Sequence, residues 1–164
     1  MISEKLIKVA MADLNIASNG EVLKTTGLGS CVGLTLFDPA KRIAGMAHVM
    51  LPSSSIARET PLNVAKYADT AIPELIERMV ALGASIRAMQ AKMAGGAQMF
   101  TLPGQTDSLR IGPRNVESCL MKLEQYNIPL LSQDTGGNFG RTIEFSSNDG
   151  ILTIRSVQHG IKEI

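Results

Sequence analysis

The feature that most constrains the fold is a long apolar run in the first third of the chain. Residues 43–51 are almost entirely apolar and are followed directly by proline. Such a run predicts a strand covered on both faces. Residues 28–37, rich in Val, Leu, Thr and Phe, predict a second strand. A turn at 39–42 separates the two, so we expect an antiparallel hairpin buried inside a layered protein.

Two residues with reactive side chains lie on this predicted hairpin. Cys31 follows a glycine-containing loop near the start of the first strand, and His48 lies near the end of the second. In an antiparallel pair these positions are adjacent. We therefore expect the imidazole to activate the thiol and to lower the pKa of Cys31 below the ~8.5 of a free cysteine. We also expect the loop at Gly29 and Ser30 to offer amide N–H groups to an oxyanion.

The alternative is that neither residue takes part in chemistry. Free cysteine is among the most buried residue types, so Cys31 can be a small core residue and His48 a buried histidine with its hydrogen bonds satisfied. Cys119 falls on the apolar face of a predicted helix, and we interpret it as structural. His159 lies near the C-terminal end, where a solvated role is expected.

The rest of the chain predicts an α+β layered domain spanning residues 1–164, with single helices between groups of strands. Asn63 is the expected N-cap of the first helix, and Pro73 predicts a kink or break within it. Asp149-Gly150 predicts the turn of a second hairpin. The other predicted strands are 6–16, 85–94, 129–132, 142–145 and 151–155, the helices are 64–83 and 113–127, and the loops are 52–61 and 100–107.

Composition excludes several classes of function. The formal net charge is +1, with 19% charged and 4% aromatic residues, so no charge surplus favours nucleic acid or an anionic membrane. No apolar run approaches the ~20 residues of a membrane helix, and no secretory signal is recognisable. We expect a cytoplasmic protein without membrane insertion. Two distant histidines and no Cys-x-x-Cys pattern predict no metal site and no cofactor.

Several motifs in order along the chain resemble the CheD family of bacterial chemoreceptor glutamine deamidases. The motifs are TTGLGSCV (25–32), MAHVMLP (46–52), KYADTA (66–71), KMAGGA (92–97), IGPRNVE (111–117), DTGGN (134–138) and GR (140–141). The resemblance implies an α/β/β sandwich. It also implies hydrolysis of receptor glutamines to glutamate with release of ammonia, through a thioester on the cysteine.

The resemblance implies a triad of Cys31 as nucleophile, His48 as base and Thr25 as the residue that orients the imidazole. The adjacent Thr26 also carries a hydroxyl, but neighbouring residues of an extended segment point to opposite faces, so only one can reach His48. The expected substrates are the cytoplasmic helices of chemoreceptors. A CheC-type phosphatase is an expected binding partner.

Two further glycine pairs are candidates for a substrate groove. Gly95 with Gly96 ends a predicted strand, and Gly136 with Gly137 forms a second glycine loop; plain turns are the alternative in both cases. Two alternatives to deamidation also stay open. A cysteine protease would use the same triad, and a chemotaxis adaptor module would bind partners without catalysis.

Overall fold

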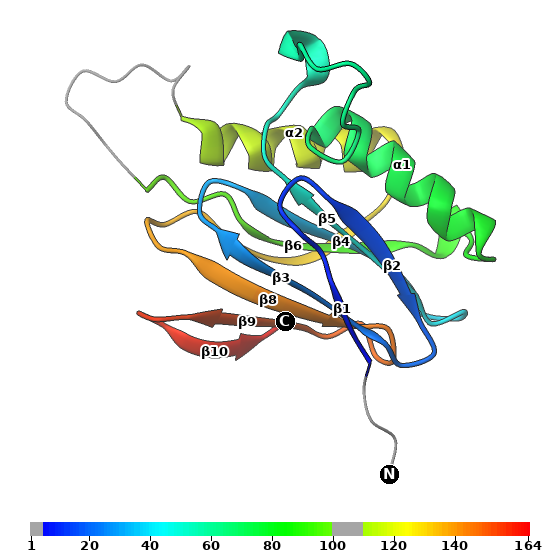
Figure 1. Ribbon diagram of the computed structural model, residues 1–164. Helices are drawn as coiled ribbons and strands as arrows, with labels where there is room; N and C mark the ends of the chain where they lie inside the picture. The colour runs from blue at the N-terminus through cyan, green and yellow to red at the C-terminus, as the bar shows by residue number, and fades with distance from the viewer. Residues whose placement is uncertain (1–4, 100–109) are drawn as a thin grey trace.

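The computed structural model describes residues 5–99 and 110–164. The loop predicted at 100–107 lies outside the described residues. Figure 1 shows the arrangement of the elements. The strands are β1 (Leu6–Lys8), β2 (Leu14–Ser18), β3 (Val22–Leu28), β4 (Val32–Asp38), β5 (Ile43–Val49), β6 (Gln90–Gly95), β7 (Leu130–Thr135), β8 (Arg141–Ser146), β9 (Leu152–Ser156) and β10 (Gly160–Glu163). The α-helices are α1 (Ala68–Ala81) and α2 (Ile111–Gln125), and the 3-10 helices are η1 (Ser54–Ile56) and η2 (Ile86–Ala88).

The strands form two stacked sheets, and the helices cover one of them. Sheet A has the strand order β1-β3-β8-β9-β10, and sheet B has the order β2-β5-β4-β6-β7. Helix α1 packs on β5 and β2, and α2 packs on β4 and β7. Both helices lie on the face of sheet B that is turned away from sheet A (Figure 1). The protein therefore has the predicted α+β fold, layered as α/β/β.

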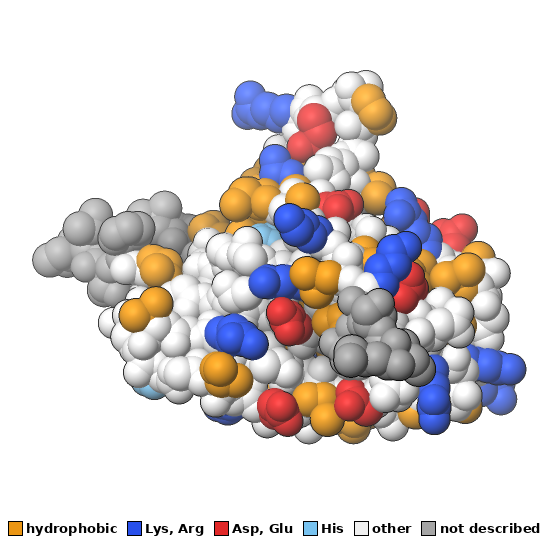
Figure 2. All heavy atoms as spheres, turned by 60° about the horizontal axis from the view of Figure 1, so that its bottom comes forward, with side chains coloured by type: hydrophobic (Ala, Val, Ile, Leu, Met, Phe, Trp, Pro, Cys, Tyr) orange, Lys and Arg blue, Asp and Glu red, His pale blue; other side chains and the backbone are white. Residues whose placement is uncertain are grey.

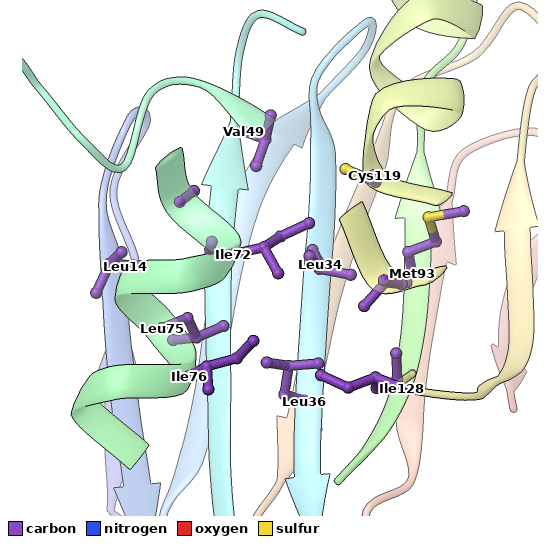
Figure 3. Packing of buried hydrophobic residues seen from close by; sticks show 14 of the residues in the cluster. Leu14, Leu34, Leu36, Val49, Ile72, Leu75, Ile76, Met93, Cys119 and Ile128 are labelled. Atoms are coloured by element: carbon purple, nitrogen blue, oxygen red, sulfur yellow. The ribbon is translucent and has the colours of Figure 1, made fainter. Parts of the chain in front are cut away.

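Strands β4 and β5 lie at the centre of these layers, and every residue in them is buried. Because successive side chains of a strand point to opposite faces, alternate residues enter different layers. Leu34 and Leu36 pack beneath the helices (Figure 3), whereas Phe37 and Met46 pack between the two sheets. The prediction that the apolar run at 43–51 is covered on both faces is confirmed for Ile43–Val49, whereas Met50 and Leu51 lie beyond the strand and are partly exposed.

Both predicted hairpins are present. β4 and β5 pair in antiparallel fashion with Gly33 opposite His48 and Val32 opposite Val49. β8 and β9 pair in the same way on either side of the turn that contains Gly150. In each case two β-rich runs separated by a short turn were sufficient to predict the pairing.

Strand boundaries near the N-terminus differ from the prediction. The strand predicted at 28–37 begins only at Val32, and Leu28 instead ends β3, which was not predicted. β3 contains the polar sequence Lys-Thr-Thr and a register shift between Thr25 and Leu28, so its alternation is obscured. The single strand predicted at 6–16 is wrong, because a turn with Ala12 at φ 58° divides the segment into β1 and β2.

The first helix also begins later than predicted. α1 starts at Ala68, and the side chain of Asn63 accepts a hydrogen bond from Ala65 N at 3.1 Å in a turn before the helix. Asn63 is therefore not the N-cap. α1 continues through Pro73, so a break is wrong, whereas a kink at this position stays a prediction. A proline removes one backbone donor, and the packing of the helix on β5 and β2 outweighs that loss.

Two further observations concern the character of the helices and the distribution of surface charge. Within residues 5–99 and 110–164, neither α-helix combines the length and apolar character needed to cross a membrane. On the face shown in Figure 2, Lys and Arg side chains are interspersed with Asp and Glu side chains. The charges on this face therefore do not form a patch of one sign.

Candidate active site

The predicted nucleophile, Cys31, is the last residue of a short loop (29–31) between β3 and β4. Its side chain is 8% exposed and belongs to the apolar layer between the two sheets. The prediction that Cys31 lies inside a strand is wrong by one residue, since β4 begins at Val32. The consequence is that Cys31 retains a loop backbone while its side chain faces the interior between the sheets.

The predicted base, His48, lies in β5 and is fully buried. Alternation along β5 places His48 on the same face as Ala44 and Met46, which pack between the sheets. His48 is opposite Gly33, so Cys31, two residues before Gly33, is its diagonal neighbour on that face. The hairpin therefore places both side chains on the face of sheet B that is turned toward sheet A, and a contact between them stays a prediction.

Thr25 of sheet A contacts His48 of sheet B across the layer between them. Its hydroxyl oxygen lies 2.7 Å from His48 Nδ1, and Thr25 is 2% exposed. The same hydroxyl donates to the carbonyl oxygen of Val9 at 2.7 Å. The neighbouring Thr26 is exposed. The expected alternation therefore directs Thr25, and not Thr26, toward the imidazole.

These contacts determine the tautomer of the imidazole. A threonine hydroxyl has one hydrogen, and here it is donated to the Val9 carbonyl, which can only accept. The Thr25 oxygen must therefore accept from His48, so Nδ1 carries the proton. Among the described residues, Nε2 is a buried atom without a hydrogen-bond partner. In the neutral imidazole the free lone pair is therefore on Nε2, which is available as a base.

Burial keeps both reactive groups neutral. Desolvation raises the pKa of the Cys31 thiol above its ordinary value, and desolvation lowers the pKa of His48 below its ordinary value. The prediction that the imidazole lowers the pKa of Cys31 is therefore wrong. The physical reason is that Nε2 makes no hydrogen bond to the thiol, so nothing offsets the burial of the thiolate.

The backbone of the Cys31 loop is held by the end of β6. The amides of Gly96 and Ala97 donate to the carbonyls of Cys31 and Gly29, both at 2.9 Å. The N–H of Gly29 donates to Gly27 O at 3.1 Å, so the prediction that Gly29 offers its N–H to an oxyanion is wrong. In the part of the chain that the structure describes, the N–H groups of Ser30 and Cys31 donate to no backbone or side-chain acceptor. The carbonyls of the loop are therefore fixed, while two amide donors near the thiol remain available.

The glycine pairs predicted as groove residues lie beside this loop. Gly95 has φ 109°, and a Cβ built on it would lie 2.3 Å from the carbonyl oxygen of Cys31. A Cβ on Gly96 would lie 2.3 Å from the side chain of Val116 in α2. Only glycine permits this close approach of β6 to the loop and to α2. Gly95 and Gly96 thus support the loop, and their contribution to a groove stays a prediction.

The second glycine loop is hydrogen-bonded to the first. Gly136 N donates to Gly95 O, and the carbonyl of Gly137 accepts from Gln98 N, both at 3.0 Å. A built Cβ on Gly136 would meet no atom within 4 Å, whereas one on Gly137 would contact the Phe139 ring. This loop is therefore part of the same end of the sandwich as Cys31.

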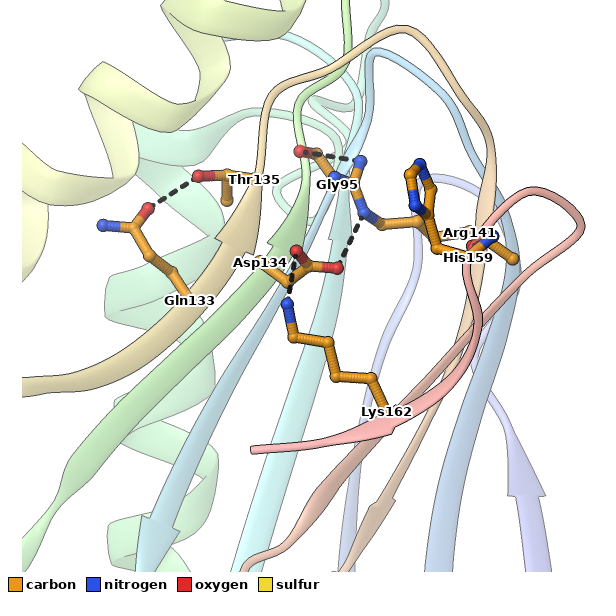
Figure 4. A network of polar contacts seen from close by, with 8 residues as sticks. Gly95, Gln133, Asp134, Thr135, Arg141, His159 and Lys162 are labelled. Carbon is orange, nitrogen blue, oxygen red and sulfur yellow. Dashed lines mark hydrogen bonds and ion pairs between the residues drawn. The ribbon is translucent and has the colours of Figure 1, made fainter.

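A buried ion pair joins the two sheets at this end. The Arg141 side chain, in sheet A, is 1% exposed and bonds Asp134 of sheet B through Nε at 3.2 Å. Its Nη1 also donates to Gly95 O at 3.5 Å, and Asp134 additionally contacts Lys162 at 3.2 Å (Figure 4). The exposed His159 stacks on Phe139 and does not contact the predicted triad. The network holds β6, β7 and β8 in position around the glycine loops.

A groove of about 740 Å³ opens near the end of β3. It lies at the end of β3, where Gly27 precedes the loop, and is bounded by the ends of β8 and β9. Its lining includes Arg141, Arg155 and the highly exposed Val157. The groove has the size range of ligand sites in proteins. Cys31, His48 and Thr25 are not among the described residues that line it, so this groove does not reach the predicted nucleophile.

Asn115 belongs to the site but was not predicted from the sequence as a functional residue. It is fully buried in α2, and its side-chain Nδ2 donates to Ser30 O at 2.9 Å and to Met50 O at 3.0 Å. The spacing of Asn115, Cys119 and Leu123, four residues apart, was the available signal that Asn115 faces the core.

The chemistry of the site follows from these groups. It combines a thiol, a neutral imidazole with a free Nε2, an orienting hydroxyl and two backbone donors, which together suit nucleophilic attack on a carbonyl carbon. Among residues 5–99 and 110–164, no group of three or more His, Cys, Asp or Glu side chains could hold a metal ion. Cys119 lies in the other apolar layer, where complete burial raises its pKa to about 12.

Comparison with known proteins adds independent information. The family model described as CheD chemotactic sensory transduction matches residues 50–156. The chemoreceptor glutamine deamidase CheD of Halalkalibacterium halodurans is 50% identical over 159 residues, which cover 97% of this chain and 98% of that protein. The protein of the same name from Bacillus subtilis is 47% identical, covering 97% and 96%. A probable chemoreceptor glutamine deamidase CheD from Lachnoclostridium phytofermentans is 49% identical, covering 98% and 99%. These alignments include the region of Cys31 and His48.

Proposed function

The chain belongs to the CheD family, and from that premise we propose that it is an amidohydrolase that converts glutamines of chemoreceptors to glutamate with release of ammonia. Curated relatives named chemoreceptor glutamine deamidase match this chain over almost its whole length. The observation that carries the proposal is the hydrogen-bonded pair of Thr25 and His48, which leaves Nε2 free on the face that also receives Cys31.

In the proposed first step, Cys31 Sγ attacks the carbon of the glutamine carboxamide. His48 Nε2 accepts the thiol proton as the S–C bond forms, because both groups are neutral at neutral pH. The negative charge that develops on the carboxamide oxygen is stabilised by the N–H of Cys31 and the N–H of Ser30. In the resulting imidazolium, the Nδ1–H group still donates its hydrogen bond to the Thr25 hydroxyl oxygen.

Collapse of the tetrahedral intermediate breaks the C–N bond. The imidazolium returns its Nε2 proton to the departing nitrogen, so ammonia leaves and a thioester remains on Cys31. Nε2 is then free to take a proton from water, which attacks the thioester carbon. Breakage of the C–S bond gives glutamate, and the proton returns to the sulfur.

Thr25 acts in this scheme by orientation. The hydroxyl has no charge, so it stabilises the imidazolium less than the carboxylate of a Ser-His-Asp triad does. It does hold the ring so that Nε2, and not Nδ1, carries out the proton transfer.

The direct test is intact-mass analysis of a chemoreceptor cytoplasmic fragment incubated with the protein. We expect the fragment to gain only the mass difference between an amide NH₂ and a hydroxyl, and peptide mapping to place each change on a glutamine. Shorter fragments would instead identify a cysteine protease. An unchanged mass would contradict both enzymatic proposals and favour a binding module.

Binding of a CheC-type phosphatase is a separate proposal that rests on family membership alone. We propose that binding does not need the thiol. A Cys31→Ala protein should therefore bind the phosphatase as the natural sequence does, while it releases no ammonia from a receptor fragment. Failure of both proteins to bind would contradict this second role without affecting the deamidase proposal.

A further inference from the structure

Asn115 of α2 connects the two segments that carry the proposed nucleophile and base. Both hydrogens of its side-chain amide are donated, one to Ser30 O at 2.9 Å and one to Met50 O at 3.0 Å. Ser30 immediately precedes Cys31, and Met50 lies two residues after His48. Since both partners are carbonyl oxygens, only the nitrogen of the amide can face them.

The two hydrogen bonds from Asn115 lie where the β-ladder between these segments ends. The last paired residues of β4 and β5 at this end are Val32 and Val49. One residue further, Met50 N donates to Lys66 O, and Cys31 O accepts from Gly96 N. The two segments therefore separate at the position of Cys31. Asn115 supplies the hydrogen bonds that join them across this gap.

The first turn of α2 is packed against the backbone that holds the loop. A Cβ on Gly112 would lie 2.1 Å from the Ala97 carbonyl, and the Ala97 amide itself donates to Gly29 O. A Cβ on Gly96 would lie 2.3 Å from Val116. Contacts this close leave α2 little freedom to shift relative to the loop. The Asn115 amide is therefore held at a fixed position.

Packing alone does not explain an asparagine at this place. The same face of α2 carries Cys119 and Leu123, which fill the apolar layer without unpaired polar atoms. Asn115 Oδ1 is buried and, among the described residues, has no hydrogen-bond partner. An unpaired buried acceptor is unfavourable, and an apolar side chain would avoid it.

We propose that Asn115 is a positioning residue for the hydrolysis reaction, which sets the separation of the Cys31 thiol and His48 Nε2 by bridging Ser30 and Met50. The inference rests on the proposed function for its catalytic meaning. It assigns to α2 a direct part in the geometry of the site, although no atom of α2 belongs to the triad.

Three variants separate positioning from stability. Asn115→Ala removes both donors, and Asn115→Asp keeps the shape but cannot make both hydrogen bonds. Leu123→Ala is the control, because Leu123 lies two turns along the same buried face and does not touch the loop. Below the unfolding midpoint of each protein, we expect kcat/KM on a receptor fragment to fall about tenfold or more for both Asn115 variants. Leu123→Ala should keep the natural rate.

A second readout needs no receptor. The rate at which iodoacetamide alkylates Cys31 is measured in four proteins. They are the natural chain, His48→Ala, Asn115→Ala and the double variant that combines these two substitutions. We expect His48→Ala to slow alkylation in the natural chain, because Nε2 can then no longer accept the thiol proton as the sulfur attacks iodoacetamide. The same change should have little effect in the Asn115→Ala chain, because the thiol and imidazole are no longer held together. If neither substitution at position 115 folds, Asn115→Ser, which keeps one donor, replaces them.

The outcomes distinguish the two proposals. Folded Asn115 variants with natural kcat/KM and an undiminished effect of His48→Ala would overturn the positioning role. A second outcome is that the natural protein never deamidates a receptor, while Asn115→Ala still removes the effect of His48→Ala on alkylation. This outcome would leave the positioning role in place and contradict the proposed function. Equal losses of kcat/KM in Asn115→Ala and Leu123→Ala would show that Asn115 acts through stability alone.

Discussion

At the scale of single residues, the Thr25 hydroxyl determines which nitrogen of His48 can act as a base. Its one hydrogen is donated to the Val9 carbonyl, so its oxygen accepts from Nδ1. The free lone pair is then on Nε2, which faces no described partner. The proposed mechanism therefore depends on an uncharged orienting group, and removal of that group should slow the reaction without abolishing it.

Substitution of the two adjacent threonines tests this assignment. Thr25→Ala should lower kcat roughly tenfold to a hundredfold, because the ring loses its orienting hydrogen bond while the nucleophile and backbone donors remain. Thr25→Ser keeps a hydroxyl and should retain most of the activity. Thr26→Ala, at an exposed position, should stay close to the natural rate. Ammonia release from one receptor fragment measures all three, and a larger loss for Thr26→Ala would move the orienting role to Thr26.

The neutral state of the thiol and imidazole gives a defined pH dependence. His48 has a lowered pKa, so activity should decline only below the ~6.5 of an ordinary histidine, as Nε2 becomes protonated. Cys31 has a raised pKa, so the alkaline decline should begin only above the ~8.5 of an ordinary thiol. We therefore expect a plateau of kcat/KM that includes pH 7 to pH 8.5. Two results would instead indicate a thiolate–imidazolium pair. One is a fall of kcat/KM that is complete between pH 7 and pH 8.5, and the other is an alkylation rate of Cys31 that does not change with pH over the same interval.

At the scale of secondary-structure elements, the end of β6 is the support on which the Cys31 loop rests. Gly95 approaches the Cys31 carbonyl so closely that any side chain would collide with backbone atoms. The hydrogen bonds from Gly96 and Ala97 fix the loop carbonyls from the same strand end. The geometry of the loop is therefore determined by a neighbouring strand more than by the loop's own sequence.

A pair of glycine substitutions tests that dependence. Gly95 and Gly20 both have positive φ, 109° and 85°, but a Cβ on Gly20 would meet nothing within 4 Å. Gly20→Ala should cost about 1–2 kcal/mol of stability from backbone strain and leave turnover unchanged. Gly95→Ala should lose more stability and also displace Cys31, with a marked fall in kcat. Thermal unfolding and ammonia release decide the matter, and equal turnover in the two variants would show that the loop does not depend on Gly95.

The elements differ in how far the sequence could predict them. The β4–β5 and β8–β9 hairpins were predictable because both partners of each pair are β-rich and separated by short turns. β3 was missed because Lys24, Thr25 and Thr26 give no apolar alternation around its irregular register. Asn115 was missed as a site residue because its partners, Ser30 and Met50, are distant in sequence and are contacted through their backbones.

At the scale of the whole molecule, the site exists only where the two sheets pack together. His48 belongs to β5 and Cys31 directly precedes β4, so their placement on one face of sheet B was predictable from local pairing. Thr25 belongs to sheet A, and its contact with His48 depends on how the sheets stack, which no local pattern specifies. The sequence suggested Thr25 only through its resemblance to a family. The same stacking buries the thiol and raises its pKa, which a reading of the hairpin alone did not anticipate.

The most direct test of the proposed mechanism is ammonia release from a chemoreceptor cytoplasmic fragment by matched cysteine variants. Cys31→Ser should fold with the natural unfolding midpoint and release no measurable ammonia, because the proposed thioester cannot form. Cys119→Ala, which changes the thiol on the far side of sheet B, should release ammonia at the natural rate. A folded Cys31→Ser protein that still converts receptor glutamine to glutamate would contradict Cys31 as the nucleophile.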